Sequence, residues 1–203
     1  MAFQTVSTSA ASLADSVADF SLTQGSNNWY YGYYPADDLT ASGFTLLDST
    51  EGDFWHHSLT WWPSWTSIFA DVVHPNGVNS PDQMEWVVRR WVSPGDFNIN
   101  ISGMLAKFDT GGNGVVGSIL VDGHYVFSRC LGASDVVGSS YFVTTSVSAG
   151  STVDFIVRPR TVDYYDSTLF TALITRSDIP VPEPTTLALA GLGLLVVWHR
   201  RKV

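Results

Sequence analysis

Cysteine is almost absent from this chain of 203 residues, in which Cys130 is the only one. A single cysteine cannot form an internal disulfide, and it cannot build a zinc site of several thiolates. Basic residues are also scarce, with 10 Lys and Arg against 19 Asp and Glu and a formal net charge of −9. Because such an acidic protein repels phosphate backbones, the composition argues against nucleic acid as a partner.

Catalytic signatures are missing too. The chain has no Gly-x-Ser-x-Gly nucleophile motif and no His-Glu-x-x-His metal motif. Glycoside hydrolysis needs two carboxylates at a fixed separation, and the acidic residues of this chain form no recognisable pair of that kind. We therefore expect a protein that is not an enzyme, and keep a small surface hydrolase or lyase as an alternative.

Amphipathic helix patterns do not occur between Phe20 and Ser177. Short β-rich runs alternate there with Gly, Pro and Asp turns, which is typical of strands. The clearest runs cover residues 85–92, 97–108, 115–129, 141–159 and 167–177. Their spacing predicts an antiparallel β-sandwich over residues 19–177. Residues 1–18 are expected to be a flexible leader outside the fold.

Two turns are predicted inside these runs. Asp122-Gly123 stands between apolar stretches, which predicts a hairpin with a type I′ turn. Ala149-Gly150 predicts a second pair of strands in the same way.

The order of the runs resembles a known kind of domain. The stretches EWVVRRWVSPGDFNINISG, GNGVVGSILVDGHYVF, VSAGSTVDFIVRP and DYYDSTLFTALI are similar to jelly-roll sandwiches of the carbohydrate-binding-module type. The resemblance covers residues 20–175 and implies a jelly-roll fold with a tendency to bind sugars. It implies no particular ligand, and none of its motifs is catalytic.

Aromatic residues are dense in two stretches, NNWYYGYYPADD and FWHHSLTWWPSW. Flat rings stack on the apolar faces of sugars, so these stretches are candidates for glycan binding. The adjacent Trp61 and Trp62 cannot both point inward in a strand, and Pro63 makes their stretch a loop or an edge. The candidate residues are Trp29, Tyr31, Trp61, Trp62 and Trp65. The alternative is a structural matrix protein without a discrete ligand, in which these rings fill the core.

Two carboxylates in VDYYDST, Asp163 and Asp166, are candidates for a structural calcium site, because calcium takes oxygen ligands. The alternative is that they are turn residues that bond their own backbone.

Arg89 and Arg90 are neighbours in a predicted strand, so one of them is expected to face inward or toward an edge. A buried arginine needs a balancing carboxylate, for which Asp154 and Asp166 are the candidates.

The C-terminus combines an apolar segment, Thr185 to Trp198, with a basic end. As a helix this segment spans about 21 Å, less than the roughly 30 Å of a hydrocarbon core. Basic residues that follow an apolar helix hold its end on the cytoplasmic side. We therefore predict a C-terminal transmembrane helix instead of a core helix, with Arg200, Arg201 and Lys202 as the membrane stop.

Pro182-Glu183-Pro184 precedes this segment. The three elements in order, over residues 178–203, resemble the PEP-CTERM sorting signal of Gram-negative bacteria. The resemblance implies that the protein stays transiently in the inner membrane until an exosortase, a membrane protease, recognises the motif. Release to the cell surface or the extracellular matrix follows. The alternative is an ordinary single-span anchor after a proline linker.

Export requires a signal peptide, yet residues 1–20 contain no Lys or Arg and no apolar run of the usual length. A true start further upstream is the simpler expectation, and an unusual export route is the other. The sequence thus predicts an exported surface sandwich whose partners are an exosortase and a polysaccharide.

Overall fold

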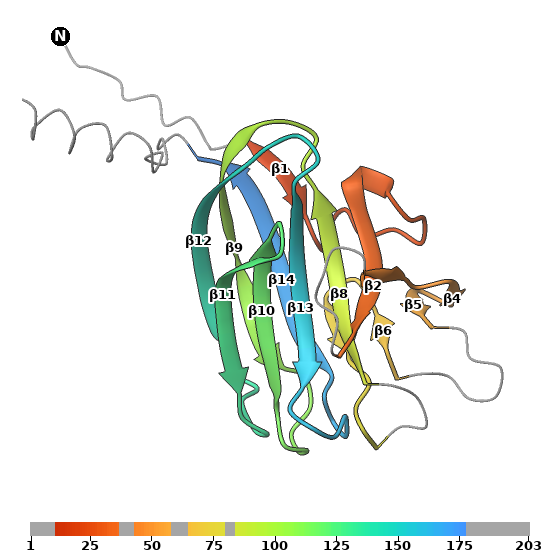
Figure 1. The fold of residues 1–203 in the computed structure, drawn as a ribbon. Coiled ribbons are helices and arrows are strands. Elements are labelled where there is room, and N and C mark those ends of the chain that lie inside the picture. The colour runs from red at the N-terminus through yellow and green to blue at the C-terminus, as the bar shows by residue number, and fades with distance from the viewer. Residues whose placement is uncertain (1–10, 37–42, 58–64, 80–83, 178–203) are drawn as a thin grey trace, which may run out of the picture.

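The computed structural model describes residues 11–36, 43–57, 65–79 and 84–177 (Figure 1). These residues form two antiparallel sheets that lie face to face, and their only helical element is the 3-10 turn η1 (Ser26–Asn28). The prediction of an all-β sandwich is confirmed. Within the described ranges no helix is long and apolar enough to cross a bilayer, and the predicted membrane helix of residues 185–198 lies outside them.

One sheet has eight strands and the other has six. The eight-stranded sheet has the order β12-β9-β14-β7-β6-β5-β4, with β1 paired to β14, and the six-stranded sheet has the order β11-β10-β13-β8-β2-β3. The strands of the first are β1 (Ser12–Asp15), β4 (Ser49–Glu51), β5 (Phe54–His56), β6 (Ser67–Ile68), β7 (Val72–His74), β9 (Phe97–Lys107), β12 (Ser139–Val147) and β14 (Thr168–Arg176). Those of the second are β2 (Trp29–Pro35), β3 (Thr45–Leu46), β8 (Glu85–Val92), β10 (Val115–Val121), β11 (His124–Leu131) and β13 (Thr152–Pro159).

Strands β7 to β14 wind between the two sheets, so that β9 pairs with β14 and β13 pairs with both β10 and β8. This winding is that of a jelly roll. The predicted strand at 85–92 coincides with β8, and those at 97–108 and 167–177 agree with β9 and β14 to within one residue at each end.

The predicted turn at Asp122-Gly123 is confirmed. Both residues have positive φ, 49° and 79°, as a type I′ turn requires, and Val121 pairs directly with His124. The Asp122 carboxylate also accepts a hydrogen bond of 2.8 Å from the backbone N–H of Thr152, which ties the hairpin to the start of β13.

The second predicted strand pair is wrong. β12 pairs with β9 in one sheet and β13 pairs with β10 and β8 in the other, so Ala149-Gly150 joins the sheets. The backbone N–H of Gly150 bonds Ser93 O at 2.8 Å, which holds this connection against the turn between β8 and β9. Two apolar strands around a glycine turn look alike in sequence whether the turn is a hairpin or a crossover.

The predicted leader boundary is also wrong, because the fold begins before residue 19. β1 pairs with β14, and Ala14 lies in the core with 2% of its surface exposed. The backbone N–H of Arg176 bonds Ala11 O at 3.1 Å, so the first and last described segments leave the sandwich side by side. A short strand rich in Ser and Ala has little hydrophobic signal of its own, and its partner lies at the far end of the chain.

The core between the sheets is aromatic and branched aliphatic. Its largest fully buried apolar side chains are Trp29, Trp91, Tyr31, Leu47, Ile68, Ile99, Ile101, Leu105 and Ile119. Burial of so much apolar surface supplies most of the driving force for folding.

Arg89 is fully buried within this core. Its Nη1 donates to Phe170 O at 2.9 Å, and its Nη2 donates to Phe69 O at 2.6 Å and Val72 O at 3.4 Å. The guanidinium thus links β8 of one sheet to β14 and the β6–β7 turn of the other. Burial lowers the pKa of Arg89 to about 10.

Arg90 points the opposite way and pairs with Asp154, with 2.7 Å between Nε and Oδ1. One of the two arginines does face inward, as predicted, but the expected carboxylate belongs to its neighbour. Within the described residues Arg89 forms no ion pair, and main-chain carbonyls satisfy its charge instead. Carbonyl partners carry no sequence signature, which is why they were not foreseen.

Arg89→Met should lower the free energy of unfolding by about 3 kcal/mol or more. Three carbonyls would lose a charged donor, and each such hydrogen bond contributes roughly 1.5–3 kcal/mol. Denaturant unfolding of the full chain measures the change, with the exposed Arg176→Met as the matched control. Equal losses in the two variants would contradict the assigned role of Arg89.

Candidate functional site

A surface cavity of about 360 Å³ lies beside the turn between β6 and β7. It is lined by Phe69, Asp71, Val72, Phe108 and Ser167. The lining comes from three segments: the turn, the residue after β9 and the residue before β14. We call this feature the turn cavity, and it brings two aromatic rings, a carboxylate and a hydroxyl together.

Backbone hydrogen bonds fix the three segments relative to one another. Phe69 N donates to Val72 O at 2.8 Å and closes the turn. Phe108 N donates to Ser167 O at 2.8 Å, and Phe170 N donates to Asp71 O at 3.1 Å. The position of each cavity wall is therefore set by the main chain, and not only by side-chain packing.

Arg89 supports the turn cavity from inside the core. Its Nη2 donates to the carbonyls of Phe69 and Val72, the first and last residues of the turn. A charged donor on both ends of one turn restricts its backbone, so the side chain of Asp71 is presented from a rigid position. Arg89 is thus a positioning residue for this site.

The two aromatic rings of the cavity differ in exposure. Phe69 is backed by Phe54, with ring centroids 4.5 Å apart and an interplanar angle of 24°. Phe108 is 64% exposed, which leaves most of its ring surface open to solvent. The cavity therefore combines one exposed ring and one partly buried ring with a carboxylate and a hydroxyl.

Trp65 is a further exposed ring, outside the lining of the turn cavity. It is 55% exposed, and its ring centroid lies 5.8 Å from that of His74. His74 and Val72 are two positions apart on β7, so their side chains face the same side of the sheet. Since Trp65 contacts His74, it lies on the same side of the sheet as the Val72 wall of the turn cavity. Burial lowers the pKa of His74, so its imidazole is neutral at neutral pH.

Glu85 contacts two residues, His57 and Thr66, which lie on either side of Trp65 along the chain. Its Oε1 lies 2.9 Å from Nδ1 of His57, and its Oε2 accepts a hydrogen bond of 2.5 Å from the Thr66 hydroxyl. Tyr33 stacks on His57 with centroids 5.0 Å apart. One buried carboxylate therefore fixes the chain on both sides of residues 58–64.

The predicted glycan-binding residues do not form one surface. Trp29 and Tyr31 have 0% exposure and belong to the core, so they cannot stack on a ligand from solvent, and this part of the prediction is wrong. Trp29 and Tyr31 are two positions apart on β2, so both side chains face the opposite sheet. There Tyr31 stacks on Trp55, with ring centroids 5.9 Å apart. Trp61 and Trp62 lie outside the described residues, and Trp65 is on the surface.

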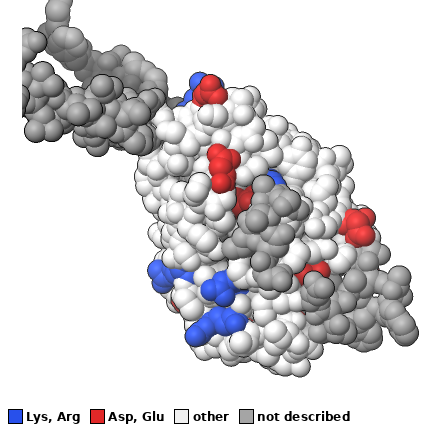
Figure 2. Space-filling view, in the orientation of Figure 1, with Lys and Arg blue, Asp and Glu red and all other residues white. Residues whose placement is uncertain are grey.

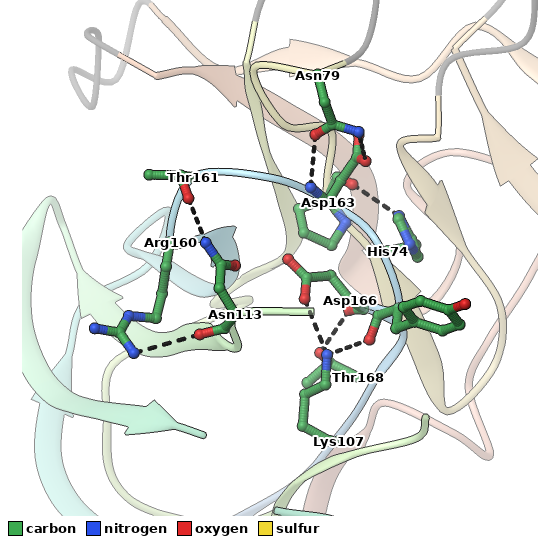
Figure 3. A network of polar contacts seen from close by, with 11 residues as sticks. His74, Asn79, Lys107, Asn113, Arg160, Thr161, Asp163, Asp166 and Thr168 are labelled. Atoms are coloured by element: carbon green, nitrogen blue, oxygen red, sulfur yellow. Dashed lines mark hydrogen bonds and ion pairs between the residues drawn. The ribbon is translucent and has the colours of Figure 1, made fainter. Parts of the chain in front are cut away.

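The two predicted calcium ligands lie in a buried polar network at the end of the sandwich (Figure 3). Asp163 Oδ2 accepts from Gly77 N at 2.9 Å, and its Oδ1 accepts from the side-chain amide of Asn79 at 2.5 Å. Asp166 Oδ1 lies 2.9 Å from Lys107 Nζ, which also donates to the carbonyl oxygen of Tyr165. These carboxylates thus organise the loop that leads into β14.

Calcium fits this network poorly, because the ammonium group of Lys107 already lies against Asp166 and would repel a second cation. Asp163 directs its oxygens at N–H donors, which leave little room for a metal. In the described part of the chain no group of three or more His, Cys, Asp or Glu residues is placed to hold a metal. The calcium site stays a prediction without a structural argument for it.

Phe69, Asp71, Phe108 and Ser167 were not expected from the sequence. Phe69 and Asp71 lie in the short run FADVV, and Phe108 and Ser167 are far away along the chain. No local motif connects them, because the jelly-roll winding brings their segments together. The one available sequence signal was Phe108 itself, an apolar residue at the end of the alternating run of residues 97–108, where a turn residue is usually polar.

The comparisons with known proteins place a motif at the C-terminus. Residues 180–202 match the model of the PEP-CTERM protein-sorting motif. The chain carries a PEP-CTERM sorting motif. Its matched residues include Pro182, Glu183, Pro184 and the basic end from Arg200 to Lys202, all outside the described residues. A PEP-CTERM motif is the recognition signal for exosortase processing, and it implies export and membrane passage in a Gram-negative bacterium.

Two solved structures show a distant likeness to the PEP-CTERM chain. One is a ruminal GH26 endo-β-1,4-mannanase with 14% identity and a TM-score of 0.30, covering 47% of this chain and 18% of that one. The other is the Podospora anserina GH26-CBM35 β-(1,4)-mannanase with 14% identity and a TM-score of 0.36, covering 75% of this chain and 29% of that one. The chain therefore spans under a third of either enzyme, and this likeness carries no argument about function. No curated protein matches it.

Lys107→Met should destabilise the sandwich by about 3–5 kcal/mol at neutral pH, because one partner of a buried ion pair is left alone. Burial raises the pKa of Asp166, and Lys107 opposes that rise. A carboxyl whose folded-state pKa is raised loses stability as the pH rises through that pKa. The deficit of the variant should therefore shrink toward acidic pH, where Asp166 takes up a proton.

Chemical unfolding of wild type and variant at neutral and mildly acidic pH checks this. Adding Asp166→Asn to Lys107→Met removes the unpaired charge and should recover part of the loss. A deficit that is the same at both pH values would show that lost packing of Lys107, and not the charge of Asp166, is the cause.

Proposed function

We propose that this exported protein is a non-enzymatic, glycan-binding component of the cell surface or extracellular matrix, and that it binds through the turn cavity. One observation carries the proposal: Phe69 and Phe108 flank a cavity that also presents Asp71 and Ser167. A pocket with apolar walls and a few polar groups is the usual form of a small-ligand site.

The chemistry of the cavity favours a sugar over a purely apolar ligand. The carboxylate of Asp71 and the hydroxyl of Ser167 offer acceptors and a donor for sugar hydroxyls. The exposed ring of Phe108 offers a flat face to the C–H groups of a pyranose. Trp65 adds a further exposed ring on the same side of the sheet.

The alternatives are supported by less. A structural matrix protein without a ligand would have no need of the exposed rings of Phe108 and Trp65, since exposed apolar patches tend to mark binding surfaces. A hydrolase would require two facing carboxylates, and Asp71 is the only carboxylate among the residues that line the turn cavity.

Phe108→Ala should weaken glycan binding by about 1 kcal/mol or more, roughly fivefold in Kd, because the most exposed ring of the cavity is removed. Asp71→Asn should weaken binding as well, through the loss of a charged acceptor. The assay is affinity electrophoresis of the full chain in detergent through galactomannan, hydroxyethyl cellulose, dextran, alginate and chitosan.

The matched control is Tyr125→Ala, which removes a ring of similar exposure, 56%, from β11 of the other sheet. It should bind like the wild type, and all variants should keep the wild-type melting temperature. If no polymer retards the wild type, the sandwich is a structural component and the glycan proposal fails.

Sorting is tested separately. Replacing Pro182, Glu183 and Pro184 with alanines should leave the full-length protein in the inner membrane, because the exosortase signal within residues 180–202 is lost. Replacing Pro180 alone, just ahead of that triplet, is the control and should allow normal processing. Immunoblots of membrane and surface fractions measure the outcome, and a normal amount of mature surface form from the triple variant would contradict the recognition of these residues.

A further inference from the structure

A second surface cavity, of about 320 Å³, lies on the eight-stranded sheet near β1. It is lined by Asp15, Val17, Ser102, Gly103, Thr171, Ala172 and Leu173. Gly103 and Ala172 are cross-strand partners of β9 and β14. We call this feature the strand cavity.

The two cavities lie along the same strand and on the same face. Ser167 lines the turn cavity, whereas Thr171 and Leu173 line the strand cavity. Because successive side chains of a strand alternate between faces, these three odd-numbered residues of one extended segment all point outward from the sandwich. At about 3.3 Å per residue, the cavities are separated by about 13–20 Å along β14.

Apart from Asp15 and Asp71 in the cavities themselves, the outward positions of the strands between the two cavities carry no charged side chain among the described residues. The outward positions of β9, β12 and β14 hold hydroxyl, amide and apolar groups: Asn98, Asn100, Ser102, Met104, Ser140, Phe142, Thr144, Ser146, Leu169, Thr171, Leu173 and Thr175. In a chain with a net charge of −9 such a face is unusual. We call these residues the neutral track.

The polar groups of the neutral track are held in order by cross-strand hydrogen bonds. Thr144 Oγ1 donates to Asn100 Oδ1 at 2.9 Å, and Ser146 Oγ donates to Asn98 Oδ1 at 2.8 Å. Phe142 is the cross-strand neighbour of Ser102 and is 67% exposed, so it places an open ring beside the strand cavity.

We propose that the neutral track binds one extended, uncharged polysaccharide chain that occupies both cavities at once. This rests on the proposed glycan binding at the turn cavity and extends it from a single sugar to a polymer. Phe108 and Phe142 would each stack on a sugar unit near one cavity, and the hydroxyl and amide groups between would bond the units that join them.

The charges around the track act against anionic polymers, and the track between the cavities offers no partner for a cationic one. Each cavity contains one carboxylate, Asp71 or Asp15, and neither is lined by a basic side chain, so a chain of uronates or sulfates is repelled. Asp15 is engaged in its own turn, where Oδ1 accepts from Val17 N at 2.9 Å. A polymer with an amine on each unit would find no counter-charge between the cavities.

Basic side chains lie elsewhere. Arg176, at the end of β14, stacks over Phe97 with 4.6 Å from its guanidinium carbon to the ring centroid. Figure 2 views the molecule from the side of the six-stranded sheet and shows blue side chains mainly toward the lower end of that face, with further blue atoms at the upper end and near the middle. Among the described residues, no Lys or Arg occupies an outward position of the neutral track.

The test compares ligands of increasing length. Oligomers of whichever neutral polymer binds, from the disaccharide upward, are titrated calorimetrically into the full chain in detergent. Affinity should rise about tenfold or more once the oligomer reaches both cavities, because the second contact is then intramolecular. Ser102→Phe, which fills the strand cavity with a side chain that strands favour, should abolish the rise and leave disaccharide binding unchanged.

Phe142→Ala, at an exposed position, is the second variant and should also reduce only the binding of long oligomers. Phe108→Ala should weaken the binding of short and long ligands alike. If disaccharide and polymer bind equally and Ser102→Phe has no effect, the neutral track is not a binding surface, while the turn cavity stands. Tighter binding of alginate than of any neutral polymer would overturn the uncharged class, and failure of every polymer would end both proposals.

Discussion

The buried guanidinium of Arg89 is the interaction on which the rest of this structure depends. A sandwich is held mainly by apolar contact, which resists separation of the sheets but allows small sliding of one over the other. Arg89 adds directional bonds from β8 to three carbonyls of the opposite layer. Two of these carbonyls belong to the β6–β7 turn. The side chain of Arg89 therefore fixes the position of one sheet relative to the other and also holds the backbone that forms the turn cavity.

Two buried charged side chains elsewhere, Lys107 and Asp163, are also held by more than one fixed partner. Lys107 is held by Asp166 and the Tyr165 carbonyl, and Asp163 is held by Gly77 and Asn79. A Cβ at Gly77 would lie 2.5 Å from Asp163 N, so only glycine allows this close approach. These networks lie at one end of the sandwich and give rigid loops to the region around the turn cavity.

Sequence reasoning performed well where the information is local. The strand limits of β8, β9 and β14 and the Asp122-Gly123 turn follow from alternation and backbone preference, which neighbouring residues determine. Strand pairing, the burial of Trp29 and Tyr31, and the carbonyl partners of Arg89 depend on segments far apart in the chain. Of the candidate site only Trp65 could be named in advance, because the turn cavity is created by the winding of the strands.

The pairing of β1 with β14 brings the two ends of the described chain together. Ala11 and Arg176 are hydrogen-bonded, so the described chain enters and leaves the sandwich at one pole, and the sorting segment follows directly from there. The turn cavity lies near the opposite end of β14, about 27 Å away at the rise of an extended strand. Anything joined to either end of the described chain therefore lies at the pole of the sandwich opposite the turn cavity, and the entrance of the cavity stays clear of both chain ends.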